Sequence, residues 1–156
     1  MLKRYGRYVM KQRREDLEHG LQKEICTFLD FQSAKIPMLY FAVPNALKFL
    51  STLKDTRRIS AAYAKMRAEG FKDGVSDLVV VIKRENRLKL GFFEQKRPAT
   101  YKLSEKTGKR VINTPAGKPT ESQLCFLDEA RKLGAYGAVS YTLDEFKAHW
   151  QKFLES

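Results

Sequence analysis

The 156-residue sequence predicts a single α/β domain in which helices flank a central mixed β-sheet. Two apolar runs with strand character, residues 78–82 and 91–97, are separated by the short polar segment 83–87, which suits a hairpin. Segments with apolar residues at helical spacing precede and follow these runs. The expected order is helix, strand, helix, strand, strand, basic insertion, helix, strand and helix.

The first half of the chain begins with a basic arm, residues 1–14, followed by a helix over residues 15 to about 34. The helix carries one apolar stripe that contains Leu17, Leu21, Ile25, Phe28 and Leu29. At about 100° per residue, Glu18 falls at the inner edge of this stripe, so its carboxylate is expected to face the sheet. A strand over 38–43 ends at the turn Pro44-Asn45. A loop over about 49–56 and a helix over about 59–69 follow.

The second half begins with a basic insertion at 98–119, in which 101–103 and 110–112 can form the arms of a hairpin around Thr107-Gly108. A disordered loop or an oligomer contact is the alternative. Thr120 and Gln123 have capping-box spacing at the start of a helix that ends at Gly134. Its buried face is expected to contain Leu124, Leu127, Ala130 and Leu133. A strand over 136–141 leads to a helix capped by Thr142 and Glu145 that buries Phe146, Trp150 and Phe153.

The amino-acid composition of the chain restricts the classes of binding partner that we expect. The formal net charge of +12 points to a polyanion, with nucleic acid first and an anionic membrane surface second. A basic protein without such a partner is the alternative. No run is long and apolar enough to span a bilayer, and the basic N-terminus lacks the apolar core of a signal peptide. Cys26 and Cys125 are expected to be reduced core residues of a cytoplasmic protein, and without a C-x-x-C pattern no zinc site is expected.

The chemistry centres on Asp77, Glu94 and Lys96. Asp77 opens a buried strand, and Glu94 and Lys96 share one face of the next strand because side chains alternate, so Gln95 points to the other face. Two carboxylates at a sheet edge suit Mg²⁺, which is commonly held by one or two carboxylates, waters and substrate phosphate oxygens. The alternative is a surface hairpin whose Glu94 and Lys96 are merely solvated or paired, because E-x-K tripeptides are common.

These residues resemble the D…E-x-K core of the PD-(D/E)XK nuclease superfamily and, more closely, the virus-type replication-repair nuclease (VRR-NUC) domain. The resemblance spans roughly residues 15 to 145. It rests on Glu18-His19-Gly20-Leu21-Gln22, Val43-Pro44-Asn45, Glu69-Gly70-Phe71, Gly74-Val75-Ser76-Asp77, Phe93-Glu94-Gln95-Lys96-Arg97, Thr120-Glu121-Ser122-Gln123 and Leu133-Gly134. Two positions depart from the family pattern: Ser76 stands where proline is usual, and Gln95 where a hydrophobic residue is usual.

The resemblance implies a restriction-endonuclease-like core and a Mg²⁺-dependent DNA endonuclease, with Mn²⁺ as a possible substitute. Asp77, Glu94 and the backbone carbonyl of Gln95 would ligate the metal, and Glu18 would hold a metal-bound water or a second ion. Lys96 would position the attacking water or help to deprotonate it. Two further residues, Gln123 and Asn45, would lie near the catalytic centre, although the capping box and the turn explain them without a catalytic role.

The resemblance also implies a substrate and an assembly. Stand-alone members that look like this chain tend to be homodimers that cut branched DNA, including four-way junctions, in a bacterial or phage-infected cytoplasm. A non-catalytic nucleic-acid-binding module on the same fold and a restriction-type endonuclease acting on linear duplex are the alternatives. The candidate DNA-contacting residues are Lys3, Arg4, Arg7, Arg13, Arg14, Asn45, Arg57, Arg58, Arg97, Lys102, Lys109 and Arg110. Solvated surface charges are the competing interpretation of these side chains.

Overall fold

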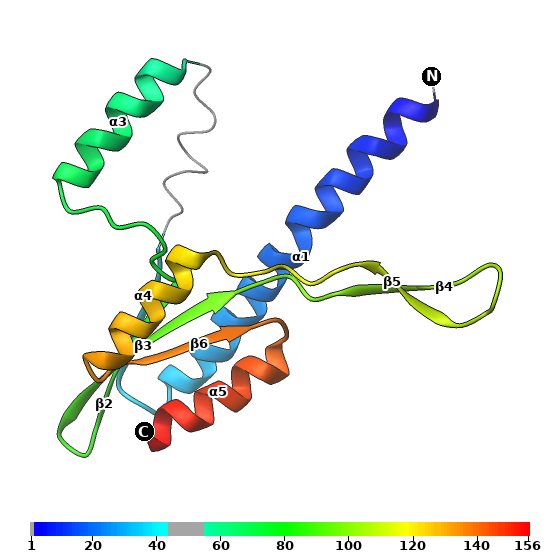
Figure 1. Ribbon diagram of the computed structural model, residues 1–156. Coiled ribbons are helices and arrows are strands. Elements are labelled where there is room, and N and C mark those ends of the chain that lie inside the picture. Colours follow the sequence, from blue (N-terminus) through cyan, green and yellow to red (C-terminus); the bar gives the residue numbers. More distant parts are fainter. Residues whose placement is uncertain (1, 44–54) are drawn as a thin grey trace.

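A computed structural model describes the backbone of residues 2–43 and 55–156 and the side chains of residues 17–43 and 55–156. The described elements are α1 (Leu2–Ser33), β1 (Met38–Ala42), α3 (Thr56–Ala68), β2 (Leu78–Arg84), β3 (Arg87–Gln95), β4 (Thr100–Leu103), β5 (Arg110–Thr114), α4 (Glu121–Lys132), β6 (Tyr136–Ser140) and α5 (Leu143–Glu155). The expected α/β architecture with a mixed sheet is confirmed (Figure 1). In the described part of the chain, no helix combines the length and apolar character that a bilayer crossing needs.

The central sheet has four strands in the order β1-β2-β3-β6. β1, β2 and β3 run antiparallel to their neighbours, and β6 runs parallel to β3. β2 and β3 meet at Glu85 and Asn86, whose φ angles of 52° and 61° are the left-handed conformations that a two-residue hairpin turn of the primed type needs. The hairpin predicted over 83–87 is therefore confirmed.

One face of the sheet packs against α1 and α5. The main hydrophobic core joins Ile25 and Leu29 of α1 to Phe93 of β3 and to Trp150 and Phe153 of α5, all of them fully buried. The Phe93 ring lies 5.7 Å from the Phe153 ring in an edge-to-face arrangement, which suits aromatic pairs in a core. The core role predicted for the aromatic residues of the last helix is confirmed.

The opposite face packs against α4. The rings of Phe92 and Phe126 meet edge to face at 5.0 Å, and Leu127 and Ala130 are buried. Glu94 lies two residues after Phe92 and so points to the same face, toward the start of α4. This arrangement puts a carboxylate on the α4 side of a strand whose other side is the hydrophobic core.

The buried face predicted for α4 is partly wrong, because Leu124 and Leu133 are exposed. The helix is rotated so that Phe126 and Gln123 face the sheet, and at about 100° per residue this rotation moves Leu124 to the solvent edge. Leu133 is the C-cap residue and no longer follows the helical periodicity. Gly134 ends the helix with a φ of 86°, as predicted.

The N-terminal helix is longer than predicted. α1 begins at Leu2, so the backbone of residues 2–14 continues the same helix. Figure 1 shows this part of α1 extending beyond the sheet, and Leu17 is accordingly exposed although Leu21, Ile25 and Leu29 are buried. The predicted helix over about 59–69 is α3, which starts earlier because Asp55 caps the backbone N–H groups of Arg57 and Arg58.

The structure also bears on the predictions for the two cysteines, the second capping box and the segment over residues 44–56. Cys26 is half-buried, but Cys125 is exposed, so its assignment to the core is wrong; both thiols are free. The second capping box forms only in part: Thr142 accepts from the Glu145 N–H, while the Glu145 carboxylate accepts from the N–H of Tyr141. The turn at residues 44–45 and most of the loop expected over 49–56 lie outside the described residues.

The basic insertion forms the predicted hairpin. β4 and β5 pair in antiparallel register, with Tyr101 opposite Ile112 and Leu103 opposite Arg110. The turn contains Gly108 with a φ of 63°, and the Gly108 N–H donates to the Ser104 carbonyl at 2.8 Å. The hairpin projects away from the central sheet (Figure 1).

Candidate active site

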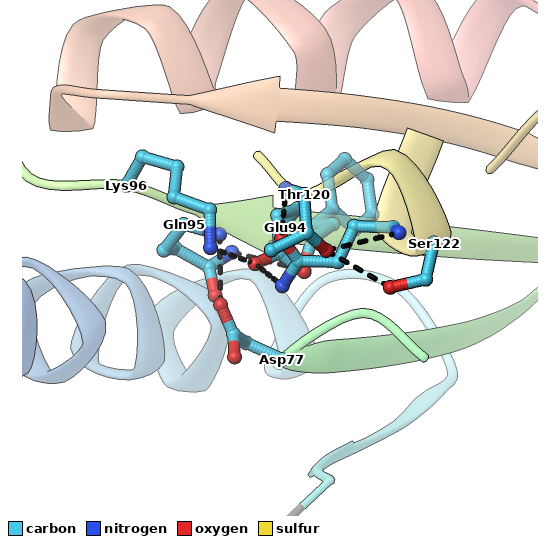
Figure 2. A network of polar contacts seen from close by, with 8 residues as sticks. Asp77, Glu94, Gln95, Lys96, Thr120 and Ser122 are labelled. Carbon is cyan, nitrogen blue, oxygen red and sulfur yellow. Dashed lines mark hydrogen bonds and ion pairs between the residues drawn. The ribbon is translucent and has the colours of Figure 1, made fainter. Parts of the chain in front are cut away.

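Asp77 and Glu94 meet where β2 begins and β3 ends. Leu78 pairs with Phe93, and this register brings the residue before β2 beside the penultimate residue of β3. Asp77 Oδ2 accepts a hydrogen bond from the backbone N–H of Gln95 at 3.1 Å, and the Asp77 carbonyl accepts from the Val43 N–H at 2.9 Å. Both contacts hold Asp77 at the sheet edge, and Figure 2 shows its carboxylate beside Gln95.

Glu94 is fully buried, and its two carboxylate oxygens differ in their contacts. Oε1 accepts from Lys96 Nζ at 2.5 Å and from Gln123 Nε2 at 2.5 Å. Oε2 is buried and has no hydrogen-bond partner among the residues that the structure describes. The predicted placement of Glu94 and Lys96 on one face is confirmed by their ion pair. A buried carboxylate oxygen without a donor is costly, so Oε2 marks a position suited to a cation or a donor.

The environment of Glu94 favours its protonated form. Burial raises the pKa of Glu94, and the nearby Asp77 charge raises it further, to about 7, although the contact with Lys96 acts in the opposite direction. Two carboxylates that share a buried site cannot easily both be ionised. A divalent cation between them would remove this repulsion, and the donor set therefore fits a hard metal ion.

Gln123 has two roles. Its side-chain oxygen accepts from the Thr120 N–H at 2.8 Å, and the Thr120 hydroxyl accepts from the Gln123 N–H at 3.3 Å, which completes the predicted capping box. From the same position, its side-chain amide nitrogen Nε2 donates to Glu94 Oε1. The predicted capping box is confirmed, and the cap fixes the amide that holds the Glu94 carboxylate. A catalytic role for Gln123 stays a prediction.

Gly74 has a structural role that the sequence pattern does not reveal. Its φ is 77°, and a Cβ at this position would lie 2.3 Å from the Ser122 backbone at the start of α4. Only glycine permits this approach, which packs the segment preceding Asp77 directly against the helix that carries Gln123. The glycine shortly before the aspartate was the available sequence signal, but its contact partner is 48 positions away.

The two departures from the family pattern, Ser76 and Gln95, are both buried. Gln95 points to the α1 and α5 face, where its Nε2 donates to the Phe93 carbonyl at 3.2 Å. Ser140 is the register partner of Gln95 on β6 and is also buried. Counting only described residues as partners, Gln95 Oε1 and the hydroxyl oxygens of Ser140 and Ser76 have none. Sequence reasoning missed Ser140, because only the strand register brings it beside Gln95.

Glu18 does not join this pair of carboxylates. It is half-buried on α1. Among the side chains that the structure describes, no group of three Asp, Glu, His or Cys residues could hold a metal ion. The site thus offers two carboxylates, a donor set that Mg²⁺ accepts because it keeps several waters. A metal-related role for Glu18 and for the Gln95 carbonyl stays a prediction.

The predicted DNA-contacting residues lie in separate regions. Arg97 follows Lys96 directly and is half-buried, and its carbonyl accepts from the Gly117 N–H at 2.9 Å. Arg57 and Arg58 are exposed on α3, where Arg58 pairs with Asp55 at 3.6 Å. Exposed cations of the hairpin are Lys102, Lys109 and Arg110. Five of the predicted side chains, and Asn45, lie outside the described side chains: Lys3, Arg4, Arg7, Arg13 and Arg14.

The fold and the site together define an α/β protein with a buried glutamate, a half-buried aspartate, a lysine and a glutamine at one sheet edge. Comparison with known proteins finds no matching family model, no matching curated protein and no matching solved structure. The function is therefore inferred from the geometry of these residues and from their chemistry.

Proposed function

We propose that this protein is a Mg²⁺-dependent DNA endonuclease of the PD-(D/E)XK type, similar to the VRR-NUC domain. The main support for the proposal is the fully buried carboxylate of Glu94. One of its oxygens is held by Lys96 and Gln123, and the other has no partner within the described part of the chain. A carboxyl whose pKa is raised by burial and by a second carboxylate is typical of a functional site. A sheet edge with a purely structural role does not require a buried carboxylate with these contacts.

Asp77 and Glu94 would hold the metal ion, and Mn²⁺ could replace Mg²⁺. When bound, the ion would polarise the scissile phosphate and make a coordinated water more acidic. Gln123 and Lys96 satisfy Oε1 of Glu94 and so leave Oε2 available as a ligand atom. The hydrogen bond from the Gln95 N–H holds the Asp77 carboxylate in a defined orientation.

Lys96 would act on the substrate from the same side. Its ammonium group lies beside the carboxylate pair, where it can donate to a phosphate oxygen or orient an attacking water. Lysine carries three N–H donors, so its bond to Glu94 leaves others for substrate. The net charge of +12 would draw in a nucleic acid and keep its backbone near this site.

The proposed substrate is branched DNA, and the proposed assembly is a homodimer, both from the resemblance to VRR-NUC proteins. A two-fold dimer would present two sites to two strands, which suits a symmetric four-way junction. A non-catalytic DNA-binding module would be expected to keep the positive charge but would not require the Asp77, Glu94 and Lys96 cluster. A restriction-type enzyme would act equally on linear duplex that contains its site.

The experiment compares cleavage of labelled four-way junction, flap, single-stranded and linear duplex DNA in Mg²⁺ or Mn²⁺. Chelator-sensitive cleavage by the wild type is expected, with no cleavage by Asp77→Ala and wild-type cleavage by Asp128→Ala, an exposed acid of α4 paired to Arg131 at 2.6 Å. The ranking of substrates separates junction from linear duplex. Salt-sensitive binding without cleavage in either metal would favour the binding module and overturn the nuclease proposal.

A further inference from the structure

The β4–β5 hairpin is anchored beside the candidate active site and leaves both of its faces open. β3 ends at Gln95, and the hairpin begins at Thr100. At the return of the chain, the Gly117 N–H donates to the Arg97 carbonyl at 2.9 Å, and a Cβ on Gly117 would lie 3.5 Å from Lys96 Cβ. Beyond this anchor the two strands form a separate two-stranded sheet that extends away from the domain (Figure 1).

One face of the hairpin presents large apolar side chains to solvent. The register places Tyr101 opposite Ile112 and Leu103 opposite Arg110, so these four residues share a face. The exposed fractions are 49% for Tyr101, 60% for Ile112 and 71% for Leu103. An isolated two-stranded hairpin is only marginally stable in water, and an exposed apolar cluster of this kind marks an interaction surface.

The same face also carries a cation on an aromatic ring. The Arg110 guanidinium lies over the Tyr101 ring at 4.2 Å from its centroid. Of the charged residues between positions 98 and 119, Glu105 is the single acid, and the basic ones are Lys102, Lys106, Lys109, Arg110 and Lys118. A protein that covered this face would have to bury the Arg110 charge, whereas DNA offers phosphates for the cations and flat bases for the ring.

We propose that the β4–β5 hairpin is an arm that stacks unpaired bases of DNA on Tyr101 and Arg110 while the neighbouring lysines contact the backbone. This inference rests on the proposed nuclease function and narrows its substrate class to DNA with unpaired nucleotides near the cleaved bond. Bases within an intact duplex are already stacked and paired, so they are not free to stack on the hairpin. The hairpin thereby favours single-stranded regions, flaps and open junctions over linear duplex.

The test is fluorescence anisotropy of the full chain in EDTA, so that binding is measured without cleavage. The probes are a labelled single strand, a duplex with an unpaired flap, and a linear duplex of the same length. Tyr101→Ala is expected to weaken binding of the single strand and the flap by roughly 5- to 100-fold and to change duplex binding by less than about twofold. Tyr101→Phe, which keeps the ring, is expected to bind like the wild type.

Val111→Ala is the matched control, because Val111 pairs with Lys102 and lies on the opposite face of the hairpin. It should bind all three probes like the wild type. Circular dichroism of each variant verifies that the fold is kept, which is expected because the substituted side chains are exposed.

The proposal would be overturned if Tyr101→Ala bound every probe like the wild type or lost affinity equally for all three. It would also be overturned if Val111→Ala showed the same loss as Tyr101→Ala, or if the wild type bound no unpaired DNA. If light scattering showed a dimer that Tyr101→Ala converts to a monomer, this face would be a protein contact instead. The nuclease proposal is tested separately, by the cleavage assay. If the wild type cuts DNA in Mg²⁺ but Tyr101→Ala binds every probe with full affinity, the nuclease proposal stands and only the proposed role of the hairpin is wrong.

Discussion

Gln123 Nε2 donates to Glu94 Oε1 at 2.5 Å while Gln123 Oε1 accepts from the Thr120 N–H at 2.8 Å. One side chain thereby caps the start of α4 and orients a buried carboxylate on a neighbouring strand. Because both ends of the amide are occupied, Gln123 cannot rotate without losing one of the two bonds. The orientation of Glu94 is therefore coupled to the start of α4.

Replacing Gln123 by glutamate separates these two roles. Gln123→Glu keeps an acceptor for the Thr120 N–H but places a second carboxylate against Glu94, so we expect little loss of stability at pH 5 and a clear loss at pH 8, where both groups are ionised. Urea unfolding at the two pH values measures this difference. Thr120→Ala, which removes only the cap, should cost about 1 kcal/mol at either pH. An equal cost of Gln123→Glu at both pH values would show that its carboxylate does not interact with Glu94.

The raised pKa of Glu94 makes stability depend on pH. The folded pKa of about 7 lies above the ordinary value of 4.5, so the folded state binds this proton more tightly than the unfolded state. The contribution of Glu94 to stability is greatest below pH 4.5, falls as the pH rises to 7 and then levels off, by roughly 3 kcal/mol at most. Glu94→Gln should therefore gain stability relative to the wild type between pH 5 and pH 8 in EDTA. A constant difference between the two proteins across this range would contradict the assignment.

Metal binding should compete with protonation of the Glu94 carboxylate. A metal ion binds the ionised carboxylates, and Glu94 is mostly protonated at pH 6 and mostly ionised at pH 8. We expect the apparent affinity for Mn²⁺, measured by calorimetry without DNA, to be about tenfold weaker at pH 6 than at pH 8. Asp77→Asn should lose most of this binding at both pH values. Affinity that is independent of pH, or unchanged in Asp77→Asn, would place the metal elsewhere.

Gly74 is expected to be intolerant of any side chain. Gly74→Ala combines a φ of 77° with a Cβ 2.3 Å from the Ser122 backbone, so the segment before Asp77 must move away from α4. Gly70→Ala is the matched control, because Gly70 has a φ of 96° but no atom of the described residues lies within 4 Å of the added Cβ. Gly74→Ala should cost at least about 1 kcal/mol more than Gly70→Ala in urea unfolding. Equal costs would mean that backbone strain alone matters at both glycines.

Local sequence patterns predict much of the fold, and they also predict that Glu94 and Lys96 lie together in the candidate site. Strand alternation alone placed Glu94 and Lys96 together, and the ion pair between them agrees. The turn at Glu85 and Asn86, the hairpin of the basic insertion and the cap at Thr120 are also local features that residue type determines. These elements depend on neighbours within a few positions, which is why a single sequence reveals them.

Features that depend on long-range packing were not predictable in the same way. The rotation of α4 that exposes Leu124 is set by the contacts of Phe126 and Gln123 with β3, and helical periodicity alone does not determine it. The burial of Ser140 beside Gln95 requires the register of two strands that are far apart in the sequence. The outward direction of α1, which leaves Leu17 exposed, depends on where the sheet ends.

The most direct test of the central claim is a single-turnover cleavage assay on flap and four-way junction DNA with wild type, Asp77→Asn, Glu94→Gln and Asp128→Asn. We expect cleavage by the wild type and by Asp128→Asn that stops in EDTA and resumes on addition of excess Mg²⁺. We expect a rate at least about 100-fold lower for the two site variants, because the isosteric amides keep the shape but remove the charges that would hold the ion. Wild-type cleavage rates in Asp77→Asn or Glu94→Gln would contradict the proposed metal-dependent mechanism.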